Sequence, residues 1–474
     1  MVITGTVQGW TTVSLPQLKN GTYDNLPFSI TNEEISWIVC LKGIGSIIGR
    51  LLAYNLVNMI GPKSCLLLSC QFFISGWFLV LNATTLPILC SARIILGIGV
   101  GITNTVYPTY ILEMADSNVR DALTTLSVTS VPFGSLMSFC IGSFVSDATL
   151  VKILLYLSIS SIPLLAIFPE SPLFLTRKGC ITEACEAISF FKDTSNLHEA
   201  RKELVFLRRA HSSDARKYRY KSDRITNDEL REATSKGGKS WLKKLPLILL
   251  PNNIYALFIG FLLITVQHFN GYFCIMEYFL IIYEKNIIDA DVNTGMILIL
   301  STALVFAFYF GTTLRNAKRR GRIMQSTILC MCVLIIWGLD FTFFIRINNG
   351  ENVSNPIVFA ILYQITFQLG LGMIPNVVID EIFSPELKDV AAIVVMIYDD
   401  MLYFVQSKMY LNFNENIGID MVYYYFGISC LFFFKFIDLF MPETRGKTNR
   451  LIQEILKEDL TYILGIYMLI DLID

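Results

Sequence analysis

Two distant stretches of this chain share one pattern. The first is Gly97–Asp121, GIGVGITNTVYPTYILEMADSNVRD, and the second is Gly370–Asp389, GLGMIPNVVIDEIFSPELKD. Each opens on Gly-x-Gly, passes through a proline and ends on Glu, six residues, a base and Asp. The glutamate and the base are displaced by the same offset, which predicts an internal repeat.

A second pair of short motifs, separated by nearly the same offset, supports the repeat. Pro169-Glu170-Ser171 ends the first set of apolar stretches, and Pro442-Glu443-Thr444 ends the second. Two halves with matching marks are the signature of a transporter built from parallel repeats, in which the substrate path runs between the halves.

Composition restricts the class of protein. Of the 474 residues, 53% are hydrophobic and only 16% are charged, whereas soluble chains are about 25% charged. A soluble multidomain enzyme is therefore excluded. A spanning helix needs about 20 mostly apolar residues. Twelve such stretches lie at about 1–18, 35–57, 65–81, 86–112, 122–145, 150–168, 246–283, 294–314, 323–345, 355–379, 390–411 and 419–441.

These stretches predict an all-α membrane protein of 12 transmembrane helices in two six-helix halves. Residues 1–168 form the N-terminal half, with a first helix that we expect to be truncated, and residues 246–441 form the C-terminal half. The polar stretch 169–245 is predicted to be a cytoplasmic helical linker, and residues 442–474 a cytoplasmic tail.

Lysine and arginine set the expected orientation. The loop 315–322 holds five of them and no acid, and cytoplasmic loops carry such an excess. Both termini are therefore predicted to be cytoplasmic. The three N-x-[ST] sequons, at Asn20, Asn82 and Asn352, fall on the predicted outer side, where glycosylation would occur.

Five motifs then identify a family. They are Thr31–Trp37 (TNEEISW), Ala92–Gly101 (ARIILGIGVG), Pro108–Glu113 (PTYILE), Pro169–Leu175 (PESPLFL) and Pro442–Thr448 (PETRGKT). The chain resembles the sugar porters of the major facilitator superfamily, most of all the insect facilitated trehalose transporters and the animal facilitative hexose transporters. This resemblance implies the major facilitator fold, facilitative transport of trehalose or a hexose by alternating access, and a multi-pass monomer in the plasma membrane without a cofactor.

A sugar site needs amides or carboxylates for hydroxyl groups and aromatic rings for the apolar faces. Candidate substrate residues on the seventh, tenth and eleventh spans are Gln267, His268, Asn270, Gln368, Asn376, Asp399 and Asp400. The alternative for each amide is a hydrogen bond between helices. An ionised Asp at a helix centre costs about 2.5–3.5 kcal/mol on insertion scales. The two aspartates therefore either face a watery cavity or pair with a base such as Lys408.

The resemblance also implies a cytoplasmic gate. Ion pairs would tie the two halves together when the site faces outward, and breaking them would open the cytoplasmic side. The residues carried over are Arg93, Glu113, Arg120, Glu170, Arg320, Arg322, Glu381, Lys388 and Glu443. The alternative is that these charges only set the topology.

Three functions stay open at this point. Residues 1–18 contain no acid, whereas proton-coupled relatives carry an Asp in the first helix, so uniport is favoured over proton symport. A non-transporting sugar sensor or degenerate member is the third reading. The cysteines show no metal-ligand spacing and no enzyme motif is present. The expected partners are a small sugar and the lipid bilayer, and the net charge of −1 gives no indication of nucleic acid.

Overall fold

The computed structural model describes residues 1–23, 30–114, 117–192, 251–283, 292–313, 317–347, 356–383, 387–447 and 451–458. All of the regular elements in these ranges are helices. The N-terminal half contains α1 (Val2–Asn20), α2 (Asn32–Ile60), α3 (Pro62–Leu81), α4 (Leu86–Met114), α5 (Ser117–Gly142) and α6 (Asp147–Ile167), and it is followed by α7 (Pro172–Lys178) and α8 (Ile181–Lys192).

The C-terminal half also follows the predicted spans, but two of its spans are broken. Its helices are α12 (Pro251–Phe269), α13 (Tyr272–Tyr283), α14 (Val292–Thr313), α15 (Arg319–Ile347), α16 (Pro356–Gln368), α17 (Ile374–Ile382), α18 (Lys388–Ile417) and α19 (Ile419–Phe440). The pair α12/α13 forms the seventh span and α16/α17 the tenth. In the described ranges, ten spans are long and apolar enough to cross a membrane, so the predicted all-α membrane fold is confirmed.

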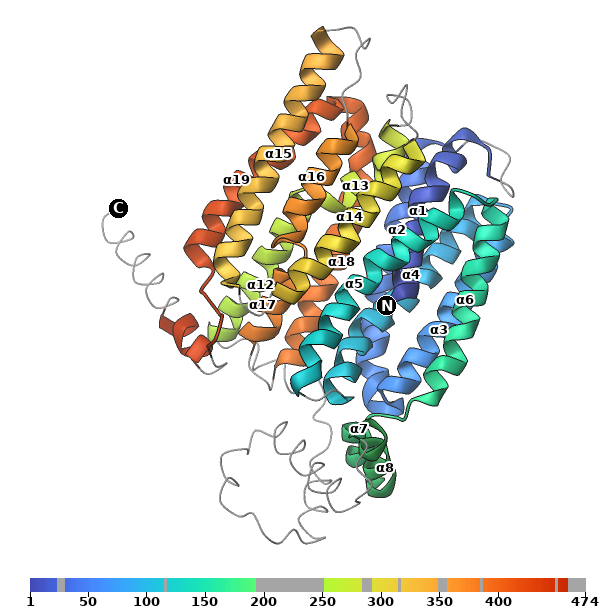
Figure 1. The fold of residues 1–474 in the computed structure, drawn as a ribbon, viewed down its shortest axis with the longest axis vertical. Coiled ribbons are helices and arrows are strands. Elements are labelled where there is room, and N and C mark those ends of the chain that lie inside the picture. The colour runs from blue at the N-terminus through green and yellow to red at the C-terminus, as the bar shows by residue number, and fades with distance from the viewer. Residues whose placement is uncertain are drawn as a thin grey trace.

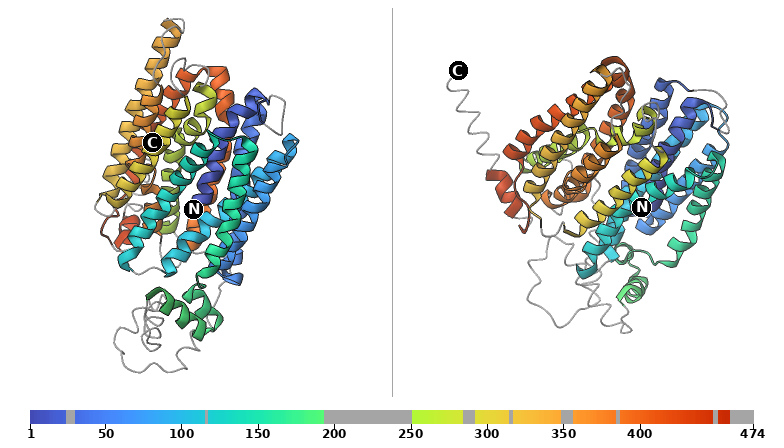
Figure 2. Two further views of the ribbon diagram at one scale, coloured as in Figure 1. Left: turned by 45° about the vertical axis from the view of Figure 1, so that its right-hand side comes forward. Right: turned by 45° about the horizontal axis from the view of Figure 1, so that its top comes forward.

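The two halves stand side by side as two bundles of upright helices (Figures 1 and 2). Helices α7 and α8 lie beneath the N-terminal half, and we call this end of the molecule the linker end and the opposite end the far end. Between the halves, α2 packs against α18, α5 against α14 and α1 against α13. We call the contact of α2 with α18 the seam.

The helices of the N-terminal half approach each other very closely. A Cβ at Gly45 of α2 would lie 2.1 Å from the carbonyl oxygen of Ile94, and one at Gly97 of α4 would lie 2.3 Å from that of Lys42. Small residues let membrane helices pack backbone against backbone in this way. The Gly-x-Gly of the first repeat stretch is thus a packing feature of α2 and α4.

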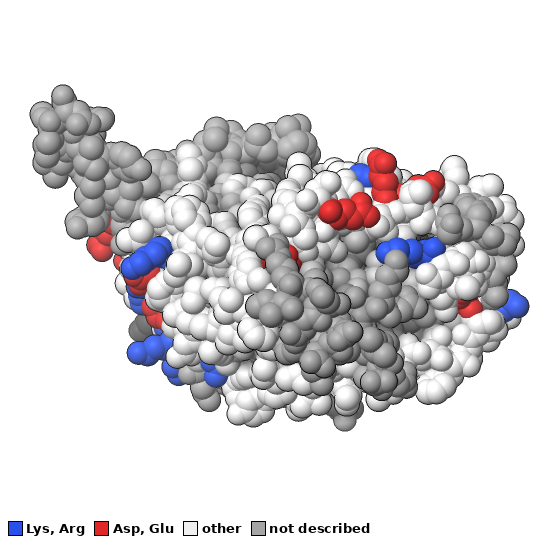
Figure 3. Space-filling view, turned by 90° about the horizontal axis from the view of Figure 1, so that it is seen from above, with Lys and Arg blue, Asp and Glu red and all other residues white. Residues whose placement is uncertain are grey.

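Viewed from the far end, the described charged side chains are few and scattered (Figure 3). Asn20 ends α1 and Asn82 follows α3, and both are exposed at this end. The third sequon, Asn352, lies outside the described residues. All eleven cysteines are free thiols.

Candidate functional site

The seventh span is broken at Asn270 and Gly271. Gly271 has a φ of 82°, a left-handed conformation that glycine adopts without strain. The Asn270 Oδ1 accepts a hydrogen bond of 2.9 Å from the Tyr272 N–H, so the side chain caps the start of α13. The break therefore follows from the local Asn-Gly sequence.

The tenth span is broken between Gln368 and Ile374. Gly370 and Gly372 lie inside the gap, and Pro375 occupies the first turn of α17, where a missing N–H costs no hydrogen bond. Glycine- or proline-interrupted spans mark the binding sites of many transporters, because non-helical backbone in a membrane is found where it is buried in protein or lines a cavity.

The two breaks lie against each other. The Tyr272 ring stacks on Phe367 with 3.6 Å between ring centroids, and its hydroxyl donates to Gln364 Oε1 at 2.8 Å. From the other side, the Tyr363 hydroxyl donates to the Asn270 carbonyl oxygen at 2.6 Å. Aromatic rings and amides thus converge where the backbone of both spans is interrupted.

Several amides at this junction have unused hydrogen-bonding capacity. The Asn270 Nδ2 and Gln364 Nε2 are buried and have no partner among the described residues. Gln267 is 5% exposed, and no described residue hydrogen-bonds its side chain. Buried donors without partners are rare and costly in folded proteins, so the junction suits a ligand that supplies acceptor oxygens.

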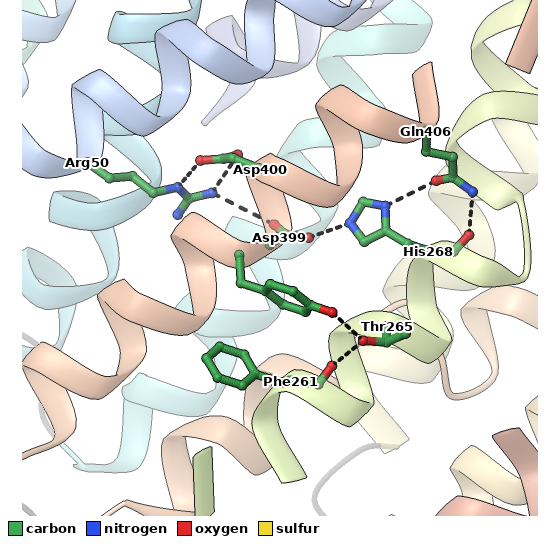
Figure 4. Close-up of polar contacts among 8 residues, drawn as sticks. Arg50, Phe261, Thr265, His268, Asp399, Asp400 and Gln406 are labelled. Carbon is green, nitrogen blue, oxygen red and sulfur yellow. Dashed lines mark hydrogen bonds and ion pairs between the residues drawn. The ribbon is translucent and has the colours of Figure 1, made fainter. Parts of the chain in front are cut away.

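Beside this junction, a chain of charged groups crosses the seam (Figure 4). Arg50 of α2 donates from Nε to Asp400 Oδ2 at 2.5 Å and from Nη2 to Asp400 Oδ1 at 3.3 Å. Its Nη2 also lies 3.9 Å from Asp399 Oδ2. Asp399 Oδ1 lies 2.8 Å from His268 Nε2, and His268 Nδ1 lies 3.2 Å from Gln406 Oε1. The chain links α2 of one half to α18 and α12 of the other.

A second charged contact between the halves lies closer to the far end than this chain of charged groups. Lys42 Nζ of α2 is 3.7 Å from Glu277 Oε1 of α13, and the Tyr403 hydroxyl of α18 donates to Glu277 Oε2 at 2.7 Å. At the far end of the seam, Lys408 donates to Ser36 Oγ at 2.9 Å. The aspartates thus pair with a base, as the alternative interpretation expected, but this base is Arg50 and not Lys408.

Six of the seven predicted substrate residues lie at the junction or on the helices that meet at the junction and the seam: Gln267, His268, Asn270, Gln368, Asp399 and Asp400. All but Asp399 are buried, and the Asp399 side chain is 31% exposed. Asn376 differs, because it lies on α17 beyond the break and is exposed. The seven residues therefore do not form one set.

Several residues of this region were not among the site residues predicted from the sequence. They are Lys42, Arg50, Tyr272, Glu277, Gln364 and Gln406. Three of them are charged residues inside apolar spans, which is a signal in its own right. Their partners could not be paired from sequence, since the register between helices from different halves is not encoded locally.

At the linker end, the glutamates of the N-terminal half are bonded within that half. The Glu170 carboxylate accepts from the backbone N–H groups of Lys63 at 2.9 Å and Ser64 at 3.3 Å, so it caps the start of α3, where the helix leaves N–H groups unpaired. The Ser171 hydroxyl donates to the Glu113 carboxylate.

The C-terminal half repeats this arrangement. Glu443 Oε1 accepts from the backbone N–H of Arg319, the first residue of α15, at 2.9 Å. The Thr444 hydroxyl donates to Glu381 Oε2 at 2.6 Å, and Arg319 Nη2 lies 3.1 Å from Glu381 Oε1. The repeat seen in the sequence is thus also a repeat of hydrogen bonds.

The other predicted gate residues have partners within the C-terminal half as well. Arg320 pairs with Asp438 at 2.6 Å, Lys388 with Asp380 at 3.4 Å, and Arg322 donates to Thr313 Oγ1 at 3.1 Å. The side chain of Arg120 lies outside the described residues.

Arg93 does not lie at the linker end, which corrects its predicted place in the cytoplasmic gate. It occupies the second turn of α4 from the far end, about 30 Å from Glu113 along the helix at 1.5 Å per residue. It is fully buried, its Nε donates to the Ile38 carbonyl oxygen at 2.9 Å, and its guanidinium lies 5.3 Å from the Trp10 ring. In this structure, Arg93 joins α1, α2 and α4.

The described residues contain no group of His, Cys, Asp or Glu that could hold a metal ion. What the site offers instead is amides, hydroxyls and carboxylates, and these suit a neutral polar solute.

Comparison with known proteins identifies the family to which this chain belongs. The profile of the sugar (and other) transporter family matches residues 1–456. Among curated relatives, the facilitated trehalose transporter Tret1 of Bombyx mori is 23% identical over 90% of this chain and 79% of its own length. The Tret1 of Apis mellifera ligustica is 25% identical over 94% and 83%. The Tret1 of Drosophila grimshawi is 26% identical over 91% of this chain but only 44% of its own length.

Solved structures show the same fold. An inward-open structure of the xylose transporter XylE from E. coli has a TM-score of 0.72 at 18% identity and covers 96% of this chain and 98% of that chain. The proton:xylose symporter XylE bound to 6-bromo-6-deoxy-D-glucose has a TM-score of 0.70 at 19% identity, covering 96% and 97%. The major facilitator fold that the motifs implied is confirmed.

Proposed function

Because this chain belongs to the sugar (and other) transporter family, we propose that it carries a sugar across a membrane by alternating access of a site between its two halves. It is a multi-pass membrane transporter and not an enzyme. The substrate that we propose is trehalose or a hexose, in line with the trehalose transporters among its relatives.

The observation that carries this proposal is the junction of the two broken spans. The unpartnered amide donors of Asn270 and Gln364, together with Gln267, suit the hydroxyl oxygens of a sugar. The stacked rings of Tyr272 and Phe367 supply an apolar surface beside these amides. In this assignment Gln368 and Asp399 belong to the same site, whereas Asn376 is a residue of the path toward the linker end.

Transport is proposed to be facilitative. The test is uptake of radiolabelled trehalose and glucose into cells that lack their own carriers, with surface biotinylation as the control for protein amount. Uptake should stop when the internal sugar reaches the external level. Accumulation that a protonophore abolishes would establish proton symport instead, the alternative that the two aspartates within the eleventh span favour. A surface protein without uptake would indicate a sensor.

For orientation, we propose that the linker end faces the cytoplasm, that both termini lie there, and that the protein is a monomer of the plasma membrane. The exposure of Asn20 and Asn82 at the far end supports this, since glycans are added on the outer side.

We further propose that the glutamates and bases of the linker end form the cytoplasmic gate. The duplicated arrangements of Glu113 with Ser171 and of Glu381 with Thr444 support a common role in the two halves. In this proposal the same charges tie the two halves together when the site faces outward.

A further inference from the structure

His268 is held between two hydrogen-bond acceptors. Its Nε2 lies 2.8 Å from Asp399 Oδ1, and its Nδ1 lies 3.2 Å from Gln406 Oε1. The orientation of the Gln406 amide is fixed, because its Nε2 donates to the His268 carbonyl oxygen at 2.7 Å. The reverse orientation would place two acceptor oxygens against each other.

A neutral imidazole has one N–H, so it can satisfy only one of these two acceptors. The arrangement needs one proton between Nδ1 and Gln406 and a second proton between Nε2 and the Asp399 carboxylate. Neutral His268 with ionised Asp399 supplies only one of them. We propose that the His268–Asp399 pair is a proton-binding site, in which one proton taken from solution completes both hydrogen bonds.

The balance of charge in the buried chain supports this assignment. With the proton bound, the positive charges of Arg50 and His268 offset the negative charges of Asp399 and Asp400, and the group is neutral. Without it, the group carries a net charge of minus one inside the membrane fold, where an uncompensated charge is costly.

A charged group on a neighbouring helix also acts on this chain of charges: among the described residues, Lys42 of α2 interacts electrostatically with Asp400. On α13, Glu277 already has Lys42 of α2 at 3.7 Å. Next to His268 on α12, α19 presents the Ser429 hydroxyl to the Phe269 carbonyl oxygen at 2.5 Å, with Phe433 packed on the ring of Phe269. Against α12 nearer the linker end, α17 presents Ile379, which lies 3.9 Å from the position of a Cβ on Gly260.

The proton site is connected to the seam through Asp399. When the proton leaves, neutral His268 keeps one N–H but no longer carries a positive charge beside Asp399, and this carboxylate, already 31% exposed and 3.9 Å from Arg50, competes with Asp400 for the guanidinium. Contact with water then lowers the free energy of this group of charges, which favours separation of the two halves along the seam. Bound protons therefore favour the closed seam. If the proton is bound both when the carrier holds sugar and when it is empty, it changes the rate of transport. It then does not drive accumulation of the sugar.

A direct test is nitrogen-15 NMR of histidine-labelled full-length protein in lipid nanodiscs. The chain has three histidines, His198, His211 and His268, and the His268→Gln variant identifies the third signal. At about pH 5.5, below the ordinary histidine range, both ring nitrogens of His268 should carry protons and show hydrogen-bonded shifts. In Gln406→Met, the Nδ1 shift should change. A His268 ring that binds only one proton at this pH would overturn the proposal.

A second test uses transport and so rests on the proposed function. Initial sugar uptake by the wild type should differ several-fold between about pH 5.5 and about pH 7.5, on either side of the ordinary histidine range. The ratio should approach one in His268→Gln, while His198→Gln and His211→Gln should keep it. An unchanged ratio in His268→Gln would overturn the proton site. Absence of uptake at every pH would count against the proposed function alone, because the NMR result does not depend on transport.

Discussion

Arg50 of α2 and Asp400 of α18 form a two-point ion pair across the seam, with N–O distances of 2.5 and 3.3 Å. Arg50 is 4% exposed and Asp400 is 8% exposed. Both groups have been removed from water, and each compensates the charge of the other. The pair therefore joins the two halves at a point where either charge alone would be costly.

Removing one partner should destabilise the protein strongly. For Arg50→Ala we expect a loss of about 3–5 kcal/mol, the usual cost of leaving a buried charge unpaired. Asp400→Ala should cost less, because Asp399 Oδ2 lies 3.9 Å from Arg50. The measurement is thermal unfolding of the solubilised protein, with the double variant completing a mutant cycle. The matched control is Lys388→Ala, whose pair with Asp380 is half-exposed and should be worth about 0–1 kcal/mol. Additive effects of the two single variants would contradict the pairing.

The amides at the junction should divide into two kinds. Gln267→Ala and Gln364→Ala remove proposed hydrogen bonds to the sugar, so each should raise the KM for uptake about two- to tenfold. Asn270→Ala removes the cap on α13 as well as a proposed donor to the sugar, so it should in addition lower the amount of folded protein at the surface. Uptake kinetics normalised to surface protein separate the two effects. An unchanged KM in both Gln variants would place the sugar elsewhere.

The gate at the linker end should matter for transport more than for folding. The double variant Arg120→Ala/Lys388→Ala is expected to reach the surface in normal amounts but to transport sugar several-fold more slowly, since the outward-facing state loses the ties between its halves. Surface biotinylation and uptake from the same cells measure both quantities. Normal uptake in the double variant would leave these charges with a role in topology only.

The orientation can be tested by glycan mapping. Asn20→Gln and Asn82→Gln should each remove a glycan and increase the mobility of the protein on a denaturing gel, and glycosidase treatment of the wild type should have the same effect. In a variant without native cysteines, a cysteine at Ser213 should react with impermeant reagents only after the cells are opened. Labelling of that cysteine in intact cells would reverse the orientation.

Hydropathy and the internal repeat predicted the twelve spans and their division into halves, because both depend on local composition and on spacing within the chain. The two breaks were not predicted. Asn270-Gly271 and the glycines at 370 and 372 lie inside apolar runs that resemble continuous helices. Only the structure shows which neighbouring segments hydrogen-bond the interrupted backbone, as Tyr363 does at Asn270.

The site was predicted as a collection of residue types and not as a set of partners. Gln267 was found because it stands at an amide position that the family resemblance implies, and His268 and Asp399 were found from their polarity within apolar spans. The pairing of Arg50 with Asp400, and the place of Arg93 beside Trp10, depend on how helices from distant parts of the chain align. That alignment results from packing between helices and leaves no periodic mark in the sequence.

The backbone contacts at Gly45 and Gly97 have a mechanical consequence. Helices that touch through their main chains cannot slide or tilt without collision, so α2 and α4 should move as one body. The C-terminal half, in contrast, has two interruptions at which a helix can bend. The N-terminal half is thus expected to move as a rigid body. Most of the bending in each transport cycle should occur at the breaks at 270–271 and 369–373.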